Sequence, residues 1–158
     1  MAYQFKYDVF LSFRGEDTRH GFTGNLWKAL QDRGINTFFD DQNLQKGEEI
    51  TPSLIKAIED SNMAIIVLSK NYATSSFCLQ ELCKILHSIK DKGRCVCPVF
   101  YDVDPSDVRK LKRSYGEAMV EHEARDSSDM DLLQKWKNAL NQVANLCGFH
   151  FKNGYVTI

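Results

Sequence analysis

Hydrophobic residues in this chain fall into short continuous runs separated by segments with helical spacing. Four runs are rich in β-branched and aromatic residues, which is typical of buried strands, and they cover 7–13, 35–39, 63–68 and 95–101. Elsewhere apolar residues recur every three or four positions and predict amphipathic helices over 22–33, 51–58, 79–89, 105–123 and 132–147. A short fifth strand is expected within 149–158.

Capping residues mark several of these helix ends. Thr51 can accept a hydrogen bond at the start of the second helix, and Pro52 suits a first helical position, where no N–H is needed. Asp104 and Pro105 repeat this arrangement further along the chain. Gly34 follows the first helix, where a glycine commonly ends a helix.

Strands that alternate with helices are typical of a parallel sheet with helices on both faces. Five such units predict an α/β fold of the flavodoxin-like, doubly wound kind. Ligands of such folds bind at the carboxyl ends of the strands. The loops expected to form a site are therefore 14–19, 40–49, 69–77 and 102–107.

Composition narrows the classes of function. The chain has 158 residues and a net charge of −1, with 43% hydrophobic and 26% charged residues. This balance fits one globular domain and gives no electrostatic reason to expect nucleic acid or an anionic membrane as a partner. No apolar run approaches the ~18 residues of a membrane span, and the N-terminus lacks the apolar stretch of a signal peptide. Five cysteines without a Cys-x-x-Cys pair favour reduced thiols in a cytosolic protein, and the scattered histidines predict no metal site.

Several motifs of nucleotide-binding and hydrolytic proteins are absent from the sequence. It contains no Gly-x-Gly-x-x-Gly after the first strand, no Walker A sequence and no Gly-x-Ser-x-Gly. Rossmann, P-loop and α/β-hydrolase sites therefore have no support. A response-regulator receiver shares the topology but needs an aspartate at the end of the third strand, where this chain has Ser69 and Lys70.

Five stretches, in order along the chain, resemble a known family. They are Tyr7–Arg19, Phe39–Gly47, Ser69–Ala73, Cys78–Leu82 and Pro98–Arg109. Together they resemble plant Toll/interleukin-1 receptor (TIR) domains, which lie at the N-terminus of intracellular nucleotide-binding, leucine-rich-repeat immune receptors. We expect a TIR domain over 5–151 and the start of a C-terminal linker over 152–158.

The resemblance implies an NAD⁺ nucleosidase. Plant TIR domains cleave the nicotinamide–ribose bond when they self-associate, and the products trigger defence and cell death. NAD⁺ is then a substrate, so no cofactor is expected, and the implied partners are further copies of the chain and other TIR proteins. The implied location is the cytoplasm, with the nucleus as an alternative. A non-catalytic scaffold that signals by TIR–TIR assembly is the second function in keeping with the family.

Glu81 matches the catalytic glutamate of the family. It also fits a structural role, because a carboxylate near a helix N-terminus is favoured by the helix dipole and can pair with Lys84. Cleavage of NAD⁺ develops positive charge on the ribose, and nicotinamide leaves as a neutral molecule. One carboxylate that stabilises this charge can therefore suffice without a general acid, and the resemblance favours that role.

The resemblance also implies substrate contacts, each with a structural alternative. Arg14 fits a contact with phosphate or ribose, and equally a solvated arginine. Phe77 stands where the family usually has a tryptophan that can stack on a ligand ring. Gly47 belongs to a loop expected to close the site of a neighbouring protomer, although it also fits a simple turn. The expected substrate-binding residues are Arg14, Gly15, Asp40, Asp41, Leu44, Gly47, Ser75 and Phe77.

Two self-association surfaces are implied as well. The first contains Thr23, Gly24 and Asn25, where the family often has a Ser-His or Asp-His pair, and the second contains Ser114, Tyr115 and Gly116. Gly116 fits either close approach of a partner or a break in the helix.

Two further features have alternative interpretations. Cys78 matches a cysteine associated in the family with a secondary, nucleic-acid-dependent cyclic-nucleotide synthesis, and it also fits a small buried hydrophobe. The basic run over 109–113 fits a solvated helix face.

Overall fold

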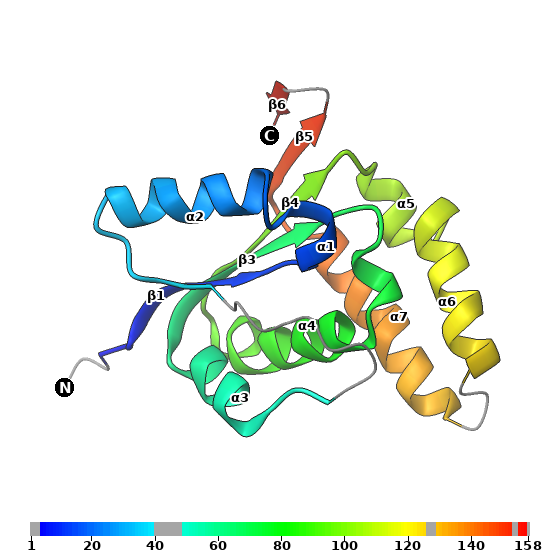
Figure 1. The fold of residues 1–158 in the computed structure, drawn as a ribbon. Helices are drawn as coiled ribbons and strands as arrows, with labels where there is room; N and C mark the ends of the chain where they lie inside the picture. Colours follow the sequence, from blue (N-terminus) through cyan, green and yellow to red (C-terminus); the bar gives the residue numbers. More distant parts are fainter. Residues whose placement is uncertain (1–3, 40–48, 126–128, 153–154, 158) are drawn as a thin grey trace.

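A six-stranded sheet forms the centre of the computed structural model, which describes residues 4–39, 49–125, 129–152 and 155–157 (Figure 1). The strand order is β2-β1-β3-β4-β5-β6, and the first five strands are parallel. The strands are β1 (Tyr7–Ser12), β2 (Thr37–Phe39), β3 (Ser61–Leu68), β4 (Val96–Tyr101), β5 (Phe149–Lys152) and β6 (Tyr155–Thr157). The predicted five-stranded parallel sheet is therefore confirmed.

Helices cover both faces of the sheet, as the alternation of elements predicts. They are α1 (Gly15–Thr18), α2 (Phe22–Asp32), α3 (Pro52–Glu59), α4 (Ser76–Ser88), α5 (Pro105–Arg109), α6 (Arg113–Arg125) and α7 (Met130–Ala144), with 3₁₀ turns η1 (Tyr72–Thr74) and η2 (Lys90–Lys92). Helix α2 covers one face of the sheet, and α3, α4 and α7 lie on the other (Figure 1).

The alternation of side chains along the strands divides the core between these two faces. Phe10 and Ile66 belong to the larger core, which α3, α4 and α7 complete. Leu11 and Val67, the next residue in each strand, belong to a smaller core against α2. Strand β3 is thus covered on both faces, which explains its continuous hydrophobic sequence.

Local capping chemistry sets several boundaries as the sequence predicts. The hydroxyl of Thr51 accepts a hydrogen bond from the Leu54 N–H at 3.2 Å, and Pro52 is the first residue of α3. Asp104 accepts from the Ser106 N–H at 2.8 Å at the start of α5. Gly34 has φ of 76°, a conformation that glycine adopts at little cost.

The structure differs from the expected elements at three places. The loop 14–19 contains the short helix α1. The helical region 105–123 consists of two helices separated at Leu111, whose φ is 55°. Residues 155–157, within the segment expected to begin a linker, pair as β6 with β5 in antiparallel register. In the described part of the chain, no helix is both long and apolar enough to cross a membrane.

Candidate active site at the carboxyl edge of the sheet

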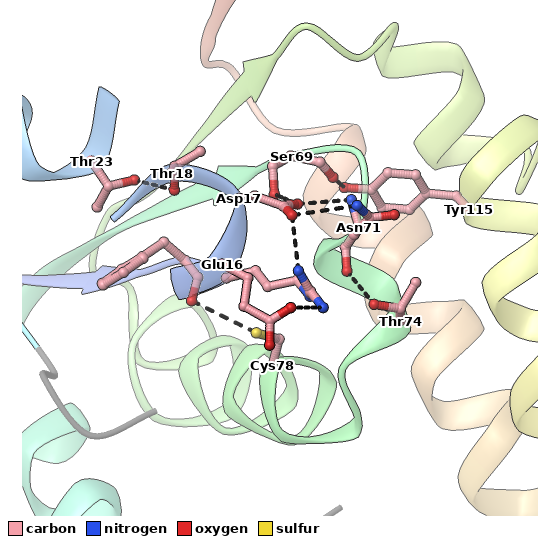
Figure 2. Close-up of polar contacts among 11 residues, drawn as sticks. Glu16, Asp17, Thr18, Thr23, Ser69, Asn71, Thr74, Cys78 and Tyr115 are labelled. Carbon is pink, nitrogen blue, oxygen red and sulfur yellow. Dashed lines mark hydrogen bonds and ion pairs between the residues drawn. The ribbon is translucent and has the colours of Figure 1, made fainter. Parts of the chain in front are cut away.

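Asp17 connects the loop after β1 to the loop after β3. The hydroxyl of Ser69 donates to one Asp17 carboxylate oxygen at 2.6 Å, and the Asn71 backbone N–H donates to the same oxygen at 2.9 Å (Figure 2). The side-chain amide of Asn71 lies 3.3 Å from the second oxygen. Because β1 and β3 are adjacent parallel strands, these loops meet at one edge of the sheet.

Asp17 keeps a charged carboxylate in this half-buried position. Burial by itself raises the pKa of Asp17, but the hydrogen bonds from Ser69 and Asn71, together with the positive charge of Arg14, outweigh it and hold the pKa below its usual value. The result is a fixed negative charge at the centre of the cluster. Asp17, Ser69 and Asn71 lie in two of the loops where the strand order predicts a site, but no motif in the sequence marks them individually as site residues.

Arg14 bridges two neighbouring carboxylates. Its Nη1 donates to Asp17 and its Nη2 donates to Glu16, both at 2.9 Å. The Arg14 side chain is 17% exposed, so the structure favours an ordered, partly buried cation over a solvated arginine. Gly15 is buried at the start of α1.

Glu81 lies in the second turn of α4 and is 2% exposed. Among the described residues it is the one carboxylate that is buried. Removing a carboxylate from water is costly, and buried carboxylates with compensating partners are common at functional sites. The ammonium group of Lys84, three residues further along α4, forms an ion pair with Glu59 at 3.3 Å.

Cys78 lies one helical turn before Glu81 and is buried. Its Sγ lies 3.7 Å from the carbonyl oxygen of Phe13 (Figure 2). Its backbone N–H donates to the Ser75 hydroxyl at 3.1 Å. Burial raises the pKa of the Cys78 thiol strongly, and the negative charge of Glu81 raises it further, while Arg14 lowers it. The charges of Arg14 and Glu81 thus both act on the Cys78 thiol, in opposite directions. Because burial dominates, the thiol stays neutral.

Two buried tyrosines support the same loops. Tyr72 lies 2.8 Å from the Ser12 hydroxyl and donates to the Cys78 carbonyl oxygen at 3.2 Å. Tyr115, from α6, donates to the Ser69 carbonyl oxygen at 2.7 Å. Burial raises the pKa of both phenols, so both remain hydrogen-bond donors.

Ser75 and Phe77 lie beside this cluster with evident structural roles. Ser75 caps α4, and half-buried Phe77 packs against the larger core. The remaining predicted substrate contacts, Asp40, Asp41, Leu44 and Gly47, lie outside the described residues.

This arrangement can be compared with known proteins. Residues 6–157 match the family model for the TIR domain. The chain belongs to the TIR domain family. The TMV resistance protein N of Nicotiana glutinosa is 52% identical over 145 residues, which are 92% of this chain and 13% of that protein. Disease resistance protein RPV1 of Vitis rotundifolia is 54% identical over 144 residues, 91% of this chain and 10% of that protein. This TIR domain is thus closely related to those of plant disease resistance proteins, and it spans only a small part of their length.

A solved structure gives the same relationship. The TIR domains of the activated Roq1 resistosome, which recognises the pathogen effector XopQ, are similar with a TM-score of 0.83 and 51% identity. The match covers 92% of this chain and 87% of that chain. The five-stranded TIR architecture therefore extends to this protein.

Two residues assigned to self-association surfaces of the TIR domain lie inside the protein instead. Thr23 is fully buried, and its hydroxyl donates to that of Thr18 at 2.6 Å (Figure 2). Tyr115 is also fully buried, as part of the larger core, and its hydroxyl donates to the Ser69 carbonyl oxygen. The burial of these two side chains leaves the exposed Asn25 and the half-buried Ser114 as the better candidates for side-chain contacts with a second copy, and both surfaces stay predictions.

Contacts within the chain explain why glycine stands at positions 24 and 116. A Cβ at Gly24 would lie 2.4 Å from the Arg19 carbonyl oxygen, and a Cβ at Gly116 would lie 2.4 Å from that of Leu111. Each glycine allows a helix to approach the preceding turn of its own chain. For Gly116 the structure therefore favours close approach over a break in the helix, and the group that approaches is the Leu111 carbonyl of the same chain.

Proposed function

We propose that this TIR domain is an NAD⁺ nucleosidase in which Glu81 is the catalytic residue. The observation that carries the proposal is the burial of the Glu81 carboxylate in α4, beside the loops at the carboxyl edge of a parallel sheet. Ligand sites of doubly wound folds lie at this edge. The match of Cys78–Leu82 to the family motif adds support from the sequence.

The chemistry requires one well-placed negative charge. Breaking the nicotinamide–ribose bond leaves positive charge on the ribose, and nicotinamide departs with the bonding electrons as a neutral molecule. A fixed carboxylate stabilises that developing charge, and a low-dielectric site strengthens the effect. Water then adds to the ribose carbon, which gives ADP-ribose in the simplest outcome.

Other residues have supporting roles in the proposal. Arg14 contacts a phosphate or ribose oxygen of NAD⁺, near Gly15. Phe77 offers an aromatic edge to a ligand ring, and Ser75 fixes the start of α4. The stretch Asp40–Gly47 of a neighbouring copy completes the site, so activity depends on self-association.

A scaffold without catalysis is the second candidate. The observation in its favour is the 51% identity to TIR domains within an assembled Roq1 resistosome. In this alternative, assembly through exposed residues such as Asn25 is the whole function, and the proposed location in the cytoplasm is common to both candidates.

Release of nicotinamide from NAD⁺ by concentrated or artificially clustered protein tests the proposal. Glu81→Ala and the isosteric Glu81→Gln are compared with Glu59→Ala, which removes an exposed carboxylate just before the amino end of β3. We expect both Glu81 variants to lose about 100-fold or more of the activity and Glu59→Ala to keep it. Wild-type protein that clusters but releases no nicotinamide supports the scaffold, and a folded, clustered Glu81→Ala with full activity overturns the role of Glu81.

A further inference from the structure

Arg14 holds its two acidic neighbours in very different ways. Asp17 is 14% exposed and is also held by Ser69 and Asn71. Glu16 is 52% exposed, and its contact with Nη2 of Arg14 is a surface ion pair at 2.9 Å. One side of the guanidinium is therefore anchored, while the other faces a solvent-accessible carboxylate.

These two ion pairs differ in how easily they exchange. An exposed pair contributes only about 0.2–1 kcal/mol, because water and salt compete for both charges. The Asp17 pair is part of a network whose members would be left unsatisfied if it opened. An incoming anion would therefore displace Glu16 and leave Asp17 in place.

The chemistry of Arg14 suits a phosphate in particular. A guanidinium presents a planar set of donors that matches the oxygens of a phosphate as well as those of a carboxylate, so a phosphate can take the place of Glu16. Arg14 also lies in the same electrostatic environment as Glu81, because both charges act on Cys78.

We propose that Glu16 is an internal competitor for the phosphate-binding side of Arg14, and that it lowers the affinity of the site for a nucleotide diphosphate such as that of NAD⁺. This inference rests on the proposed function, since it concerns the substrate of the same site. Asp17 acts as a positioning residue that holds the guanidinium while Glu16 exchanges with the ligand. The competing explanation is that Glu16 only stabilises the first turn of α1, where an acidic residue is favoured.

Substitutions that remove the carboxylate charge but keep the shape of the side chain separate these two explanations. Glu16→Gln is compared with Glu59→Gln, a matched control that is also 52% exposed and ion-paired, to Lys84, but precedes the amino end of β3. We expect Glu16→Gln to lower the KM for NAD⁺ about two- to fivefold, the range for one exposed ion pair, and Glu59→Gln to leave KM unchanged. In an Arg14→Gln background, Glu16→Gln should have no effect on KM.

A binding experiment without turnover keeps this test separate from that of the proposed function. Calorimetry with ADP-ribose on Glu81→Ala protein, with and without Glu16→Gln, should show the same two- to fivefold gain in affinity. The proposal is overturned by an unchanged or higher KM in Glu16→Gln, by an equal gain in Glu59→Gln, or by a gain that persists without Arg14. No gain in ADP-ribose binding, including no detectable binding by either protein, also overturns it, whereas a gain without NAD⁺ cleavage by wild type contradicts only the proposed function.

Discussion

The hydroxyl of Ser69 donates to the carboxylate of Asp17 across 2.6 Å, although the two residues are 52 positions apart in sequence. The bond joins the ends of β1 and β3 and thereby fixes the position of Arg14, which the same carboxylate holds at 2.9 Å. One aspartate thus orders both loops beside α4.

Replacing Asp17 by Asn should destabilise the protein in a pH-dependent way. The pKa of Asp17 is lower in the folded protein than in the unfolded chain, so its ionised form contributes stability above about pH 4 and loses that contribution as pH falls further. We expect Asp17→Asn to cost about 1.5–3 kcal/mol at pH 7 and progressively less below about pH 4. Urea denaturation of both proteins at pH 7 and at pH 3.5 measures this difference, and a constant difference would contradict the account.

Cys78 should be unreactive in the folded protein. Burial and the charge of Glu81 raise the pKa of its thiol, whereas Cys95 and Cys147 are exposed. Labelling with iodoacetamide at pH 8, followed by mass spectrometry of peptides, should show modification of Cys95 and Cys147 long before Cys78. If Cys78 were labelled as fast as Cys95, its thiol would be accessible and reactive, and a nucleophilic role would be supported instead.

Gly24→Ala should destabilise the protein despite the higher helix propensity of alanine. The added Cβ meets the Arg19 carbonyl oxygen at 2.4 Å, so α2 must shift away from the preceding turn. We expect a loss of about 1–3 kcal/mol, which outweighs a propensity gain of about 1 kcal/mol. Thermal denaturation of Gly24→Ala beside the unchanged protein provides the measurement. A melting temperature equal to or above that of the unchanged protein would be inconsistent with this packing.

Tyr115→Phe should weaken the fold without removing a surface contact. The substitution deletes the hydrogen bond to the Ser69 carbonyl oxygen and leaves that buried acceptor without this donor. We expect a loss of about 1–3 kcal/mol in the free energy of unfolding. Sedimentation at matched concentrations should show unchanged association of the folded variant, whereas weakened association with unchanged stability would place Tyr115 at an interface after all.

The pattern of the sequence was sufficient for the architecture, because periodicity and capping are local properties. Buried runs such as β3 and caps such as Thr51 act within one element, so the chain itself contains the information. The break at Leu111 and the pairing of 155–157 with β5 escaped prediction, since a positive φ at leucine and the edge pairing of a short strand depend on neighbouring elements.

The roles of individual side chains depended on tertiary structure. Arg14 and Glu81 could be identified as candidates by motif, but whether Arg14 is solvated or anchored was decided by Asp17, Ser69 and Asn71, which come from two separate loops. Likewise, the family resemblance implies self-association surfaces that contain Thr23 and Tyr115, and the fold buries both side chains fully. The sequence determined the main strands and helices and their order, because their patterns are local. Burial and partners across the sheet edge arose only when segments distant in sequence packed together.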